Sequence, residues 1–548
     1  MTHWLLALLT LFAPADLQNE RASINIMLND WHRAAWLADE DAYFAHFAGD
    51  DAVFMGTDAT ERWTAKEFRA WAHPYFERGK AWEFFAEGER NISFNAAADT
   101  AWFDEQLVTP NMGPCRGTGV LIKQGDQWKI AHYNLSIPLP NAIVDDVVAM
   151  AARELLGEEQ MYTPRPGDWH AWLDTPGGKL PFRLVFQTQA GKLVPFIVNG
   201  GEYIEVPRFE INRQTHEVIL AFDHYDSIIR AEIDQLGLRM HGTWTKRRGP
   251  DNFATIPFHA SAGDQQLFPN IARTAHFNER PFFIRQPVRF DQSEETAIFA
   301  AREVYPSIIE ATFETPTGDY RYLAGNMHSN DRIQLSVFDG AHAFLFDIKR
   351  ADDGSLTGDF WSGDWWHDTL KSVADLSDMP APWNMTLASE HTPWSAYSFP
   401  DAAGKMHSLA DNIESPRLIY LFGTWCPNCT DATALLKQLK ADHPALEVVG
   451  LAFEVTGDAQ RDANQINIYA KRHTIDWPLL LAGTSDKADA TKALPFLSGV
   501  KAYPTFIFIK PGGEIDSIYT GFAGPATGES HEQLKREFTE AINRLTDR

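Results

Sequence analysis

The sequence has 548 residues, which is too many for one hydrophobic core, so several domains are expected. Its 44% hydrophobic residues, with 18 Trp and 36 Phe, are typical of a folded globular protein and exclude extensive disorder. The 74 acidic and 48 basic residues give a formal net charge of −26. This charge argues against nucleic acid or an anionic membrane as a partner, because phosphate groups require a basic surface.

The chain begins with a short apolar run, from Trp4 to Phe12, followed by Ala13-Pro14-Ala15. This pattern predicts a signal peptide over residues 1–15, although the segment before the run carries no Lys or Arg. The alternative is a buried N-terminal helix or strand. The run is too short to remain as a membrane anchor, so no transmembrane segment is expected in the mature chain. We therefore expect an exported protein in an extracytoplasmic compartment, such as the periplasm, where disulfides can form.

Residues 18–141 show the pattern of an α+β domain. A first helix is predicted with an apolar stripe that includes Ile26, Trp31 and Leu37. A second helix is predicted from Thr64, which forms a capping box with Glu67. Strand-like runs follow, and the last is a hairpin around Gly125-Asp126.

The stretches "FAGDDAVFMGTDATERW" and "CRGTGVLIKQGDQWKIAHYNLSIPLPN" resemble the SnoaL-like (nuclear-transport-factor-like) family. The resemblance implies a cone-shaped α+β fold with a cavity, but no single reaction. Five polar residues could face such a cavity as acid–base groups, or could simply be hydrogen-bonded core residues: Asp58, Arg62, Asp104, Arg116 and His132. Cys115 is either a small buried residue or a third redox thiol.

A helical junction is predicted over residues 142–167, ending at "TPRPG". Residues 168–378 then alternate strand-like runs with Gly- and Asn-rich turns, which predicts an antiparallel β-barrel or sandwich with up to two subdomains. The stretches "LRMHGTWTK" and "LTGDFWSGDWW" look alike, as two sheets or a closing barrel would produce. The aromatic group at Trp361, Trp365, Trp366 and His367 is either core or an edge for a partner.

The Pro-rich residues 379–397 are predicted to be a linker, and residues 398–548 an α/β domain of order βαβαββα. In this domain "FGTWCPNCT" places Cys426 and Cys429 where an apolar strand meets a helix. A zinc site is disfavoured because no second ligand pair is nearby, and c-type haem because Thr430 stands where the motif needs His. Peroxiredoxin chemistry is disfavoured by Ile419 and Gly423, and two inert core cysteines remain an alternative.

A redox pair fits the local physics best. At the first turn of a helix, unpaired N–H groups and the helix dipole favour a thiolate at Cys426, the expected nucleophile. Cys429 lies one turn on and would resolve the mixed disulfide. Pro427 suits the first turn, where the missing N–H is harmless. Trp425 either shields the pair from water or is ordinary packing. No metal and no cofactor beyond the redox-active disulfide is expected.

A second element stands 78 residues later, in "AYPTFIF". Pro504 stands directly before a β run. In folds with a CxxC pair at a strand–helix junction, a proline at this position is cis and faces the disulfide, so a cis Tyr503–Pro504 bond is expected. The backbone of Tyr503 would then be available to a substrate peptide.

The stretches "FPDAAGKMHSLADNIESPRLIYLFGTWCPNC", "YPTFIFIKPGGEI" and "YTGFAGPATG" resemble the TlpA/ResA branch of thioredoxin-like thiol–disulfide oxidoreductases. The upstream stretches "TPTGDYRYLAG", "FDGAHAFLF" and "GDFWSGDWW" resemble the β region that precedes the thioredoxin domain in some long members. The resemblance implies protein disulfides as substrates, contacted by Trp425, Tyr503, Pro504 and Thr505.

The resemblance also implies that Glu454 accepts a thiol proton, although a solvated Glu at the start of a loop is the alternative. Pro427 and Asn428 tune the redox potential, and their identity departs from the family pattern. A reductase supplied by a membrane electron donor is expected, while an oxidant or isomerase remains open. A different hypothesis is a multi-domain binding protein whose thioredoxin-like domain serves only for docking.

Overall fold

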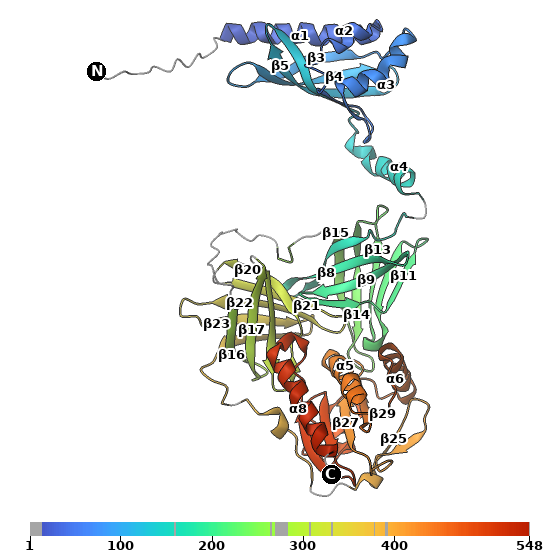
Figure 1. Ribbon diagram of the computed structural model, residues 1–548, viewed down its shortest axis with the longest axis vertical. Coiled ribbons are helices and arrows are strands. Elements are labelled where there is room, and N and C mark those ends of the chain that lie inside the picture. The colour runs from blue at the N-terminus through green and yellow to red at the C-terminus, as the bar shows by residue number, and fades with distance from the viewer. Residues whose placement is uncertain are drawn as a thin grey trace, which may run out of the picture. The chain divides into compact units, whose positions relative to one another are not determined.

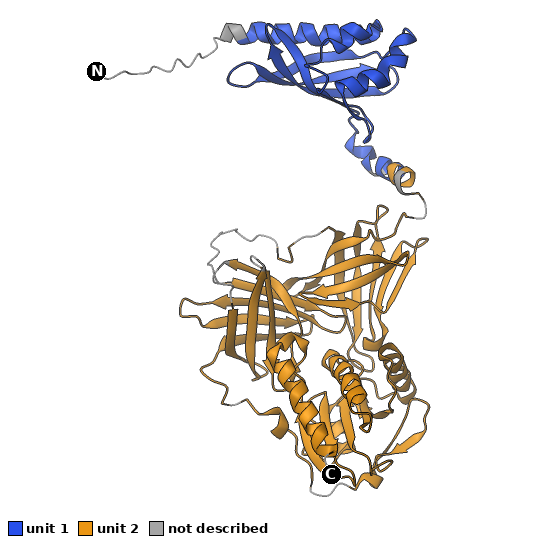
Figure 2. Cartoon of the chain, viewed as in Figure 1, with its two compact units in different colours: residues 1–150 blue, residues 151–548 orange. Residues whose placement is uncertain are grey.

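The computed structural model describes residues 14–157, 160–263, 266–268, 283–305, 308–329, 332–377, 379–389 and 393–546. The chain divides into two compact units, residues 1–150 and 151–548 (Figure 2). The division falls within helix α4 (Val144–Leu156), inside the predicted helical junction. Residues 1–13 of the expected signal peptide lie outside the described residues. Among the described helices, none combines the length and apolarity needed to cross a membrane.

Unit 1 is an α+β domain in which helices pack on a sheet (Figure 1). The six-stranded sheet has the order β2-β1-β6-β5-β4-β3, in which β1 and β6 are parallel and the other pairs antiparallel. The alternating burial along β4 shows that one face of the sheet contributes to a core shared with the helices. The helices are α1 (Pro14–Trp36), α2 (Glu40–Phe44) and α3 (Ala65–Glu77). The strands are β1 (Val53–Met55), β2 (Arg62–Thr64), β3 (Phe85–Phe94), β4 (Thr100–Thr109), β5 (Gly113–Gln124) and β6 (Gln127–Ser136).

The apolar stripe predicted for the first helix is confirmed at Trp31 and wrong at Ile26 and Leu37. Ile24, Leu28 and Trp31 are buried, whereas Ile26 is 64% exposed and Leu37 is 60% exposed. The spacing of four and three residues from Ile24 to Trp31 is the repeat of one helix face, and Ile26 lies off it. The capping box at Thr64 is confirmed, with both reciprocal hydrogen bonds to Glu67 present.

Unit 2 begins with a nine-stranded antiparallel sheet of order β10-β9-β8-β7-β15-β14-β13-β12-β11. Within the described residues its end strands β10 and β11 are not paired with each other, so hydrogen bonds do not close this sheet. The strands are β7 (Gly167–Thr175), β8 (Gly178–Gln189), β9 (Lys192–Asn199), β10 (Glu202–Glu205), β11 (Arg208–Asn212), β12 (Glu217–Phe222), β13 (Ser227–Ile233), β14 (Arg239–Arg247) and β15 (Phe253–Ala262).

The second nine-stranded sheet closes into a barrel, because β17 pairs with both β16 and β18. Its order is β17-β16-β24-β23-β22-β21-β20-β18-β19. The strands are β16 (Phe283–Phe290), β17 (Thr296–Tyr305), β18 (Ile308–Thr315), β19 (Gly318–Asp319), β20 (Leu323–Ser329), β21 (Arg332–Phe338), β22 (Ala343–Arg350), β23 (Leu356–Ser362) and β24 (Trp366–Ser372).

The predicted antiparallel β region therefore consists of two sheets, one open and one closed into a barrel, which agrees with the prediction of up to two subdomains. The two similar stretches fall on β14 and β23, and each is the last strand but one of its own nine-stranded sheet in chain order. The sheets pack against each other through Phe338, whose ring stacks on Phe182 at 4.5 Å between centroids. Buried Asn199 donates to the carbonyl oxygen of the same Phe338 and fixes this contact.

The C-terminal part is a five-stranded sheet of order β29-β28-β27-β30-β31 with helices α5, α6, α7 and α8 (Figure 1). The sequence prediction lacked β29 and α7; the observed order is βαβαβαββα. The elements are β27 (Arg417–Phe422), α5 (Pro427–Asp442), β28 (Glu447–Glu454), α6 (Ala459–His473), β29 (Leu479–Thr484), α7 (Lys487–Ala493), β30 (Thr505–Ile509), β31 (Ile515–Thr520) and α8 (Glu529–Thr546). A short hairpin, β25 (Ser398–Pro400) and β26 (Met406–Ser408), precedes them.

The described part of the predicted linker, residues 379–397, packs against this sheet instead of hanging free. Trp383 lies edge-on to Tyr519 and donates from its indole N–H to Glu537. Trp394 is buried and donates to the carbonyl oxygen of Gly513. The Pro-rich, aperiodic sequence correctly predicted that this segment forms no long helix or strand. It did not predict that Trp383 and Trp394 would fix the segment to the sheet.

Candidate functional site

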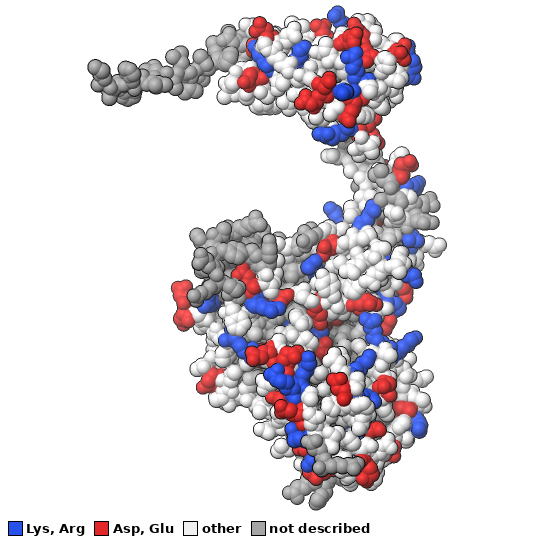
Figure 3. Space-filling view, in the orientation of Figure 1, with Lys and Arg blue, Asp and Glu red and all other residues white. Residues whose placement is uncertain are grey.

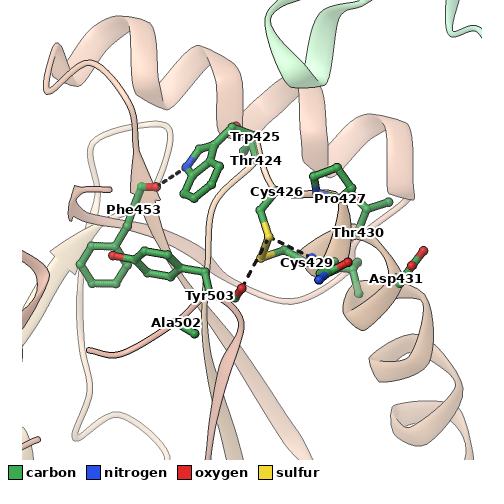
Figure 4. The surroundings of a disulfide bond; sticks show 12 residues. Thr424, Trp425, Cys426, Pro427, Cys429, Thr430, Asp431, Phe453, Ala502 and Tyr503 are labelled. Atoms are coloured by element: carbon green, nitrogen blue, oxygen red, sulfur yellow. Dashed lines mark hydrogen bonds between the residues drawn. A yellow bond between two sulfur atoms is a disulfide. The ribbon is translucent and has the colours of Figure 1, made fainter. Parts of the chain in front are cut away.

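The two cysteines lie at the junction of β27 and α5. Cys426 is the N-cap of α5 and Pro427 is its first residue. Cys426 and Cys429 form a disulfide, with their Cα atoms 5.2 Å apart (Figure 4). The backbone N–H of Cys429 also points at Cys426 Sγ, at 3.2 Å. That N–H belongs to the first helical turn and also lies 3.1 Å from the Cys426 carbonyl oxygen. Because it points at the sulfur, it would stabilise negative charge on Cys426 Sγ after reduction.

The residues before β30 face this disulfide. The Tyr503–Pro504 peptide bond is cis, as the sequence predicts. The Tyr503 carbonyl oxygen lies 3.8 Å from Cys426 Sγ, and the Tyr503 ring lies edge-on to Trp425 at 5.9 Å between centroids (Figure 4). Trp425 is held in place because its indole N–H donates to the carbonyl oxygen of Phe453. Thr505 is 0% exposed and donates to the carbonyl oxygen of Ala502, so its side chain holds the turn together.

Glu454 ends β28 and is 1% exposed, so it is a buried group and not the solvated loop residue of the alternative. Its carboxylate accepts two hydrogen bonds from Thr424, one from the backbone N–H at 3.0 Å and one from Oγ1 at 2.8 Å. Burial raises the pKa of Glu454 to about 7, although the hydrogen bonds from Thr424 oppose the shift. The sequence predicts a proton-accepting carboxyl at Glu454. The structure connects this carboxyl to Thr424, two residues before Cys426.

A cavity of about 310 Å³ opens at the cysteine pair. Cys426 contributes to its lining and is 6% exposed, whereas Cys429 is 0% exposed. The C-terminal α/β region supplies one wall of this cavity, through Trp425, Pro427 and Tyr503. The opposite wall comes from the closed barrel, and its residues include Glu295, Thr315, Thr317, Gly318, Asp319, Tyr320 and His342.

The barrel contacts the N-terminal part of α5 through Arg321, a residue that was not predicted from the sequence. This guanidinium is nearly buried and forms ion pairs with Asp431 of α5 and, at 2.7 Å, with Glu202 of the first sheet. Its Nε lies 3.7 Å from Asp339, in the turn between β21 and β22. One cation therefore connects the first sheet, the barrel and the cysteine-bearing helix.

The pKa values of the acidic side chains around Arg321 are shifted by burial and by neighbouring charges. Burial raises the pKa of Glu202 to about 7 and that of Asp319 to about 6, and Arg321 opposes both shifts. Burial also raises the pKa of Asp431. For Asp339 burial acts in the same direction, but His342, Arg321 and backbone N–H groups outweigh it and hold its pKa well below the usual range.

Further contacts connect both sheets to the terminal helices. Asn428 donates to the carbonyl oxygen of Asp319 at 3.2 Å, and Tyr225 donates to Thr430 Oγ1 at 3.2 Å. Arg461 of α6 pairs with Asp226 of the first sheet. Two of the three upstream stretches with a family resemblance contain these residues: "TPTGDYRYLAG" holds Asp319 and Arg321, and "FDGAHAFLF" holds Asp339 and His342. They carried a usable signal, because ionisable residues stand at or next to strand ends there.

In unit 1 the predicted cavity residues do not gather at a buried site. Asp58, Arg62 and Arg116 are exposed, and Asp104 and His132 are half-buried. The buried polar cluster is a different one, centred on Glu105, which is 1% exposed. Its carboxylate contacts His32 Nε2 at 2.9 Å, Tyr133 OH at 3.1 Å and Arg90 Nε at 2.7 Å. Burial raises the pKa of Glu105, but His32 and Arg90 outweigh it and the pKa is lowered. The prediction missed this cluster because its members come from a helix and three strands.

The remaining residues singled out from the sequence, Cys115 and the aromatic group at 361–367, differ in how exposed they are. Cys115 is buried, and burial raises its thiol pKa. Trp361 and Trp365 pack against the core of the first sheet, whereas Trp366 is 42% exposed and His367 is exposed and paired with Asp359. In the part of the chain that the structure describes, no three His, Cys, Asp or Glu side chains are arranged to share a metal ion. On the face shown in Figure 3, basic and acidic side chains are interspersed.

Residues 24–140 match the family described as the SnoaL-like domain. Unit 1 therefore contains a SnoaL-like domain, as the sequence predicts. Unit 2 adds a region of two antiparallel sheets, one of them a closed barrel, and a C-terminal α/β region, which together make a multi-domain protein of mixed class.

Solved structures resemble separate parts of the chain. One is a secreted Mycobacterium tuberculosis disulfide oxidoreductase described as homologous to E. coli DsbE, with 17% identity over 27% of this chain and 96% of that chain, and a TM-score of 0.22. A putative thiol:disulfide interchange protein DsbE from Chlorobium tepidum has 16% identity over 27% and 92%, with a TM-score of 0.22. An NTF2-like protein of unknown function from Pseudomonas putida KT2440 has 18% identity over 23% and 90%, with a TM-score of 0.19. TM-scores of this size do not establish a shared fold.

Proposed function

We propose that the protein is an exported thiol–disulfide oxidoreductase whose residues 398–548 form a thioredoxin-like domain of the TlpA/ResA type. One observation carries the proposal: the Cys426–Cys429 pair caps α5 and faces the cis Tyr503–Pro504 bond, with the Tyr503 carbonyl oxygen 3.8 Å from Cys426 Sγ. The central β27 flanked by β28 and β30, and the buried Glu454 beside Thr424, support the same reading.

In the reducing direction the reaction is an exchange of two electrons. The Cys426 thiolate attacks one sulfur of a substrate disulfide, forms a mixed disulfide and expels the other substrate sulfur as a thiolate, which takes up a proton. The Cys429 thiolate then attacks Cys426 Sγ, which releases the second substrate thiol and restores the Cys426–Cys429 disulfide. Cys426 is assigned the attacking role because it lines the cavity, and Cys429 the resolving role because it is fully buried.

Glu454 is proposed to accept the proton that the Cys429 thiol loses before it attacks. A carboxyl with a pKa near 7 can both take up and release a proton at neutral pH, as a general base must. Thr424 fixes its orientation through two hydrogen bonds. Trp425 and Tyr503 are proposed to contact the substrate, with Pro504 shaping the backbone between Tyr503 and β30; Thr505 is assigned to the turn and not to substrate contact, because its side chain is buried.

Protein disulfides outside the cytoplasm are the proposed substrates, and a membrane electron donor is proposed to return the pair to the dithiol form. Pro427 and Asn428 are proposed to tune the potential. Asn428 is tied to Asp319 of the barrel, so the barrel takes part in that tuning.

The proposal is tested by titrating the wild-type protein in glutathione buffers of graded potential. We expect a reversible two-electron transition, in which a tenfold change in the equilibrium ratio corresponds to about 30 mV. Cys426→Ser and Cys429→Ser should abolish the transition, and Cys115→Ser should leave it unchanged. With a disulfide substrate, Cys429→Ser should accumulate a mixed disulfide and Cys426→Ser should not. A wild-type protein without a reversible transition would support the docking-module hypothesis instead.

A further inference from the structure

The cavity at Cys426 continues into a second one on the barrel. The two cavities share four lining residues, Asp319, Tyr320, His342 and Asn428, so they adjoin. The second measures about 450 Å³ and is lined in addition by Arg248, Phe344, Phe360, Ser362, Trp365 and Trp366. We refer to the two adjoining cavities as the groove. Both volumes lie in the range of about 300–1,000 Å³ that is usual for ligand sites.

The far half of the groove is made by the β region. Apart from Asn428, its lining residues come from the barrel and from Arg248, which follows β14 of the first sheet. Trp366 begins β24 and is 42% exposed, which leaves an aromatic surface open to a ligand. The neighbouring Trp365 is fixed from both sides, since it packs on the first sheet and the Arg248 guanidinium lies over its ring at 4.4 Å.

Asn428 marks the joint between the two cavities. Its Nδ2 faces the Asp319 carbonyl oxygen at 3.2 Å, and a carbonyl can only accept, so the orientation of the amide is determined. This leaves Oδ1 buried and without a hydrogen-bond partner among the described residues. Asn428 therefore holds the C-terminal region against the barrel at the point where the two cavities adjoin.

We propose that the groove binds an extended polypeptide segment of the substrate, with its disulfide at Cys426 and a large apolar side chain against Trp366. The groove has Cys426 in one cavity and the exposed Trp366 in the adjoining one. This fits a peptide chain, because such a chain presents its disulfide and a large side chain at different positions. A small disulfide would need the first cavity alone. This inference rests on the proposed function, and it assigns substrate selection to the barrel.

The test compares two disulfide-bonded peptides that are identical except for Trp or Ala near the reactive cysteine, with cystamine as a small disulfide lacking a peptide chain. Single-turnover rate constants are measured with the pre-reduced full-length protein. Trp366→Ala should lower the rate constant for the Trp peptide by about tenfold, the value expected for loss of one aromatic contact. The rate constants for the Ala peptide and for cystamine should not change, and Trp366→Phe should retain most of the preference.

Trp71→Ala is the matched control, because Trp71 in unit 1 is also 42% exposed, and it should change none of the rates. The inference is overturned if Trp366→Ala leaves the Trp peptide unaffected, or if it slows all three substrates by the same factor. Both of these outcomes leave the proposed function standing. If the reduced wild-type protein reacts with none of the three disulfides, the proposed function itself fails.

Discussion

Replacing Arg321 with Met should destabilise unit 2 far more than an ordinary ion-pair deletion. Arg321 pairs with Asp431 and Glu202, and Asp339 lies within 3.7 Å of it. At 2.7 Å and an effective dielectric constant of about 20, the attraction to Glu202 alone is roughly 6 kcal/mol. Desolvation offsets much of this in the native protein, but the variant leaves the buried acids without a cation. Removing one partner of a buried pair costs about 3–5 kcal/mol, which is the loss expected here.

The loss should depend on pH with a definite sign. In the native protein the pKa of Glu202 is raised to about 7 and that of Asp319 to about 6. Raised carboxyl pKa values contribute stability below the unfolded-state pKa, and this contribution disappears as the pH rises through the folded-state value. Without Arg321 these pKa values rise further. The destabilisation by Arg321→Met should therefore be largest near pH 8 and smaller near pH 5, where Glu202 and Asp319 are protonated in both proteins.

The assay is urea unfolding of the oxidised full-length protein at pH 5 and pH 8. Arg302→Met is the control, because Arg302 belongs to the same barrel and pairs with Glu310 at 2.8 Å, but with its side chain 66% exposed. Such a surface pair contributes about 0–1 kcal/mol. Equal losses for the two variants, or a loss for Arg321→Met that is the same at both pH values, would refute the reasoning.

Two further predictions concern single residues of the C-terminal region. Burial raises the pKa of Glu454 to about 7, so its ionisation should cost about 3 kcal/mol of stability between pH 5 and pH 8. Glu454→Gln should therefore flatten the pH dependence of the free energy of urea unfolding by that amount. An unchanged pH dependence would count against the assigned pKa. Gly521 and Gly512 have φ angles of +91° and +90°, but an added Cβ would lie 2.5 Å from the Pro316 carbonyl oxygen at Gly521 and would meet no atom within 4 Å at Gly512. Gly512→Ala should therefore lower the free energy of unfolding by about 1 kcal/mol, because of backbone strain. Gly521→Ala should lower it at least about twice as much in the same assay. Equal losses would mean that the backbone at Pro316 shifts at no cost to make room for the added methyl group.

Local signals in the sequence were sufficient for several features. The capping box at Thr64, the strand–helix junction at Cys426 and the cis-proline at Pro504 each depend on a few adjacent residues, and each is present. β29 was missed because "PLLLAG" is a short apolar run that periodicity alone does not separate from a loop or a buried helix segment.

The rest depends on contacts between residues far apart in the chain. Arg321 meets Glu202 across 119 positions and Asp431 across 110, and no local pattern encodes either pairing. The closure of the barrel depends on β17 pairing with β18 as well as with β16, which the strand-like sequences leave undetermined. For the same reason, the sequence identified the cysteines but not the barrel residues that form the second wall of the cavity.

The central claim is that Cys426 and Cys429 form a working redox couple, and the most direct measurement is the titration of the wild-type protein in glutathione buffers. The account predicts one reversible two-electron transition that disappears in Cys426→Ser and persists in Cys115→Ser. A pair that stays locked in one state across the whole range of buffer potentials, or a transition that survives Cys426→Ser, would contradict it.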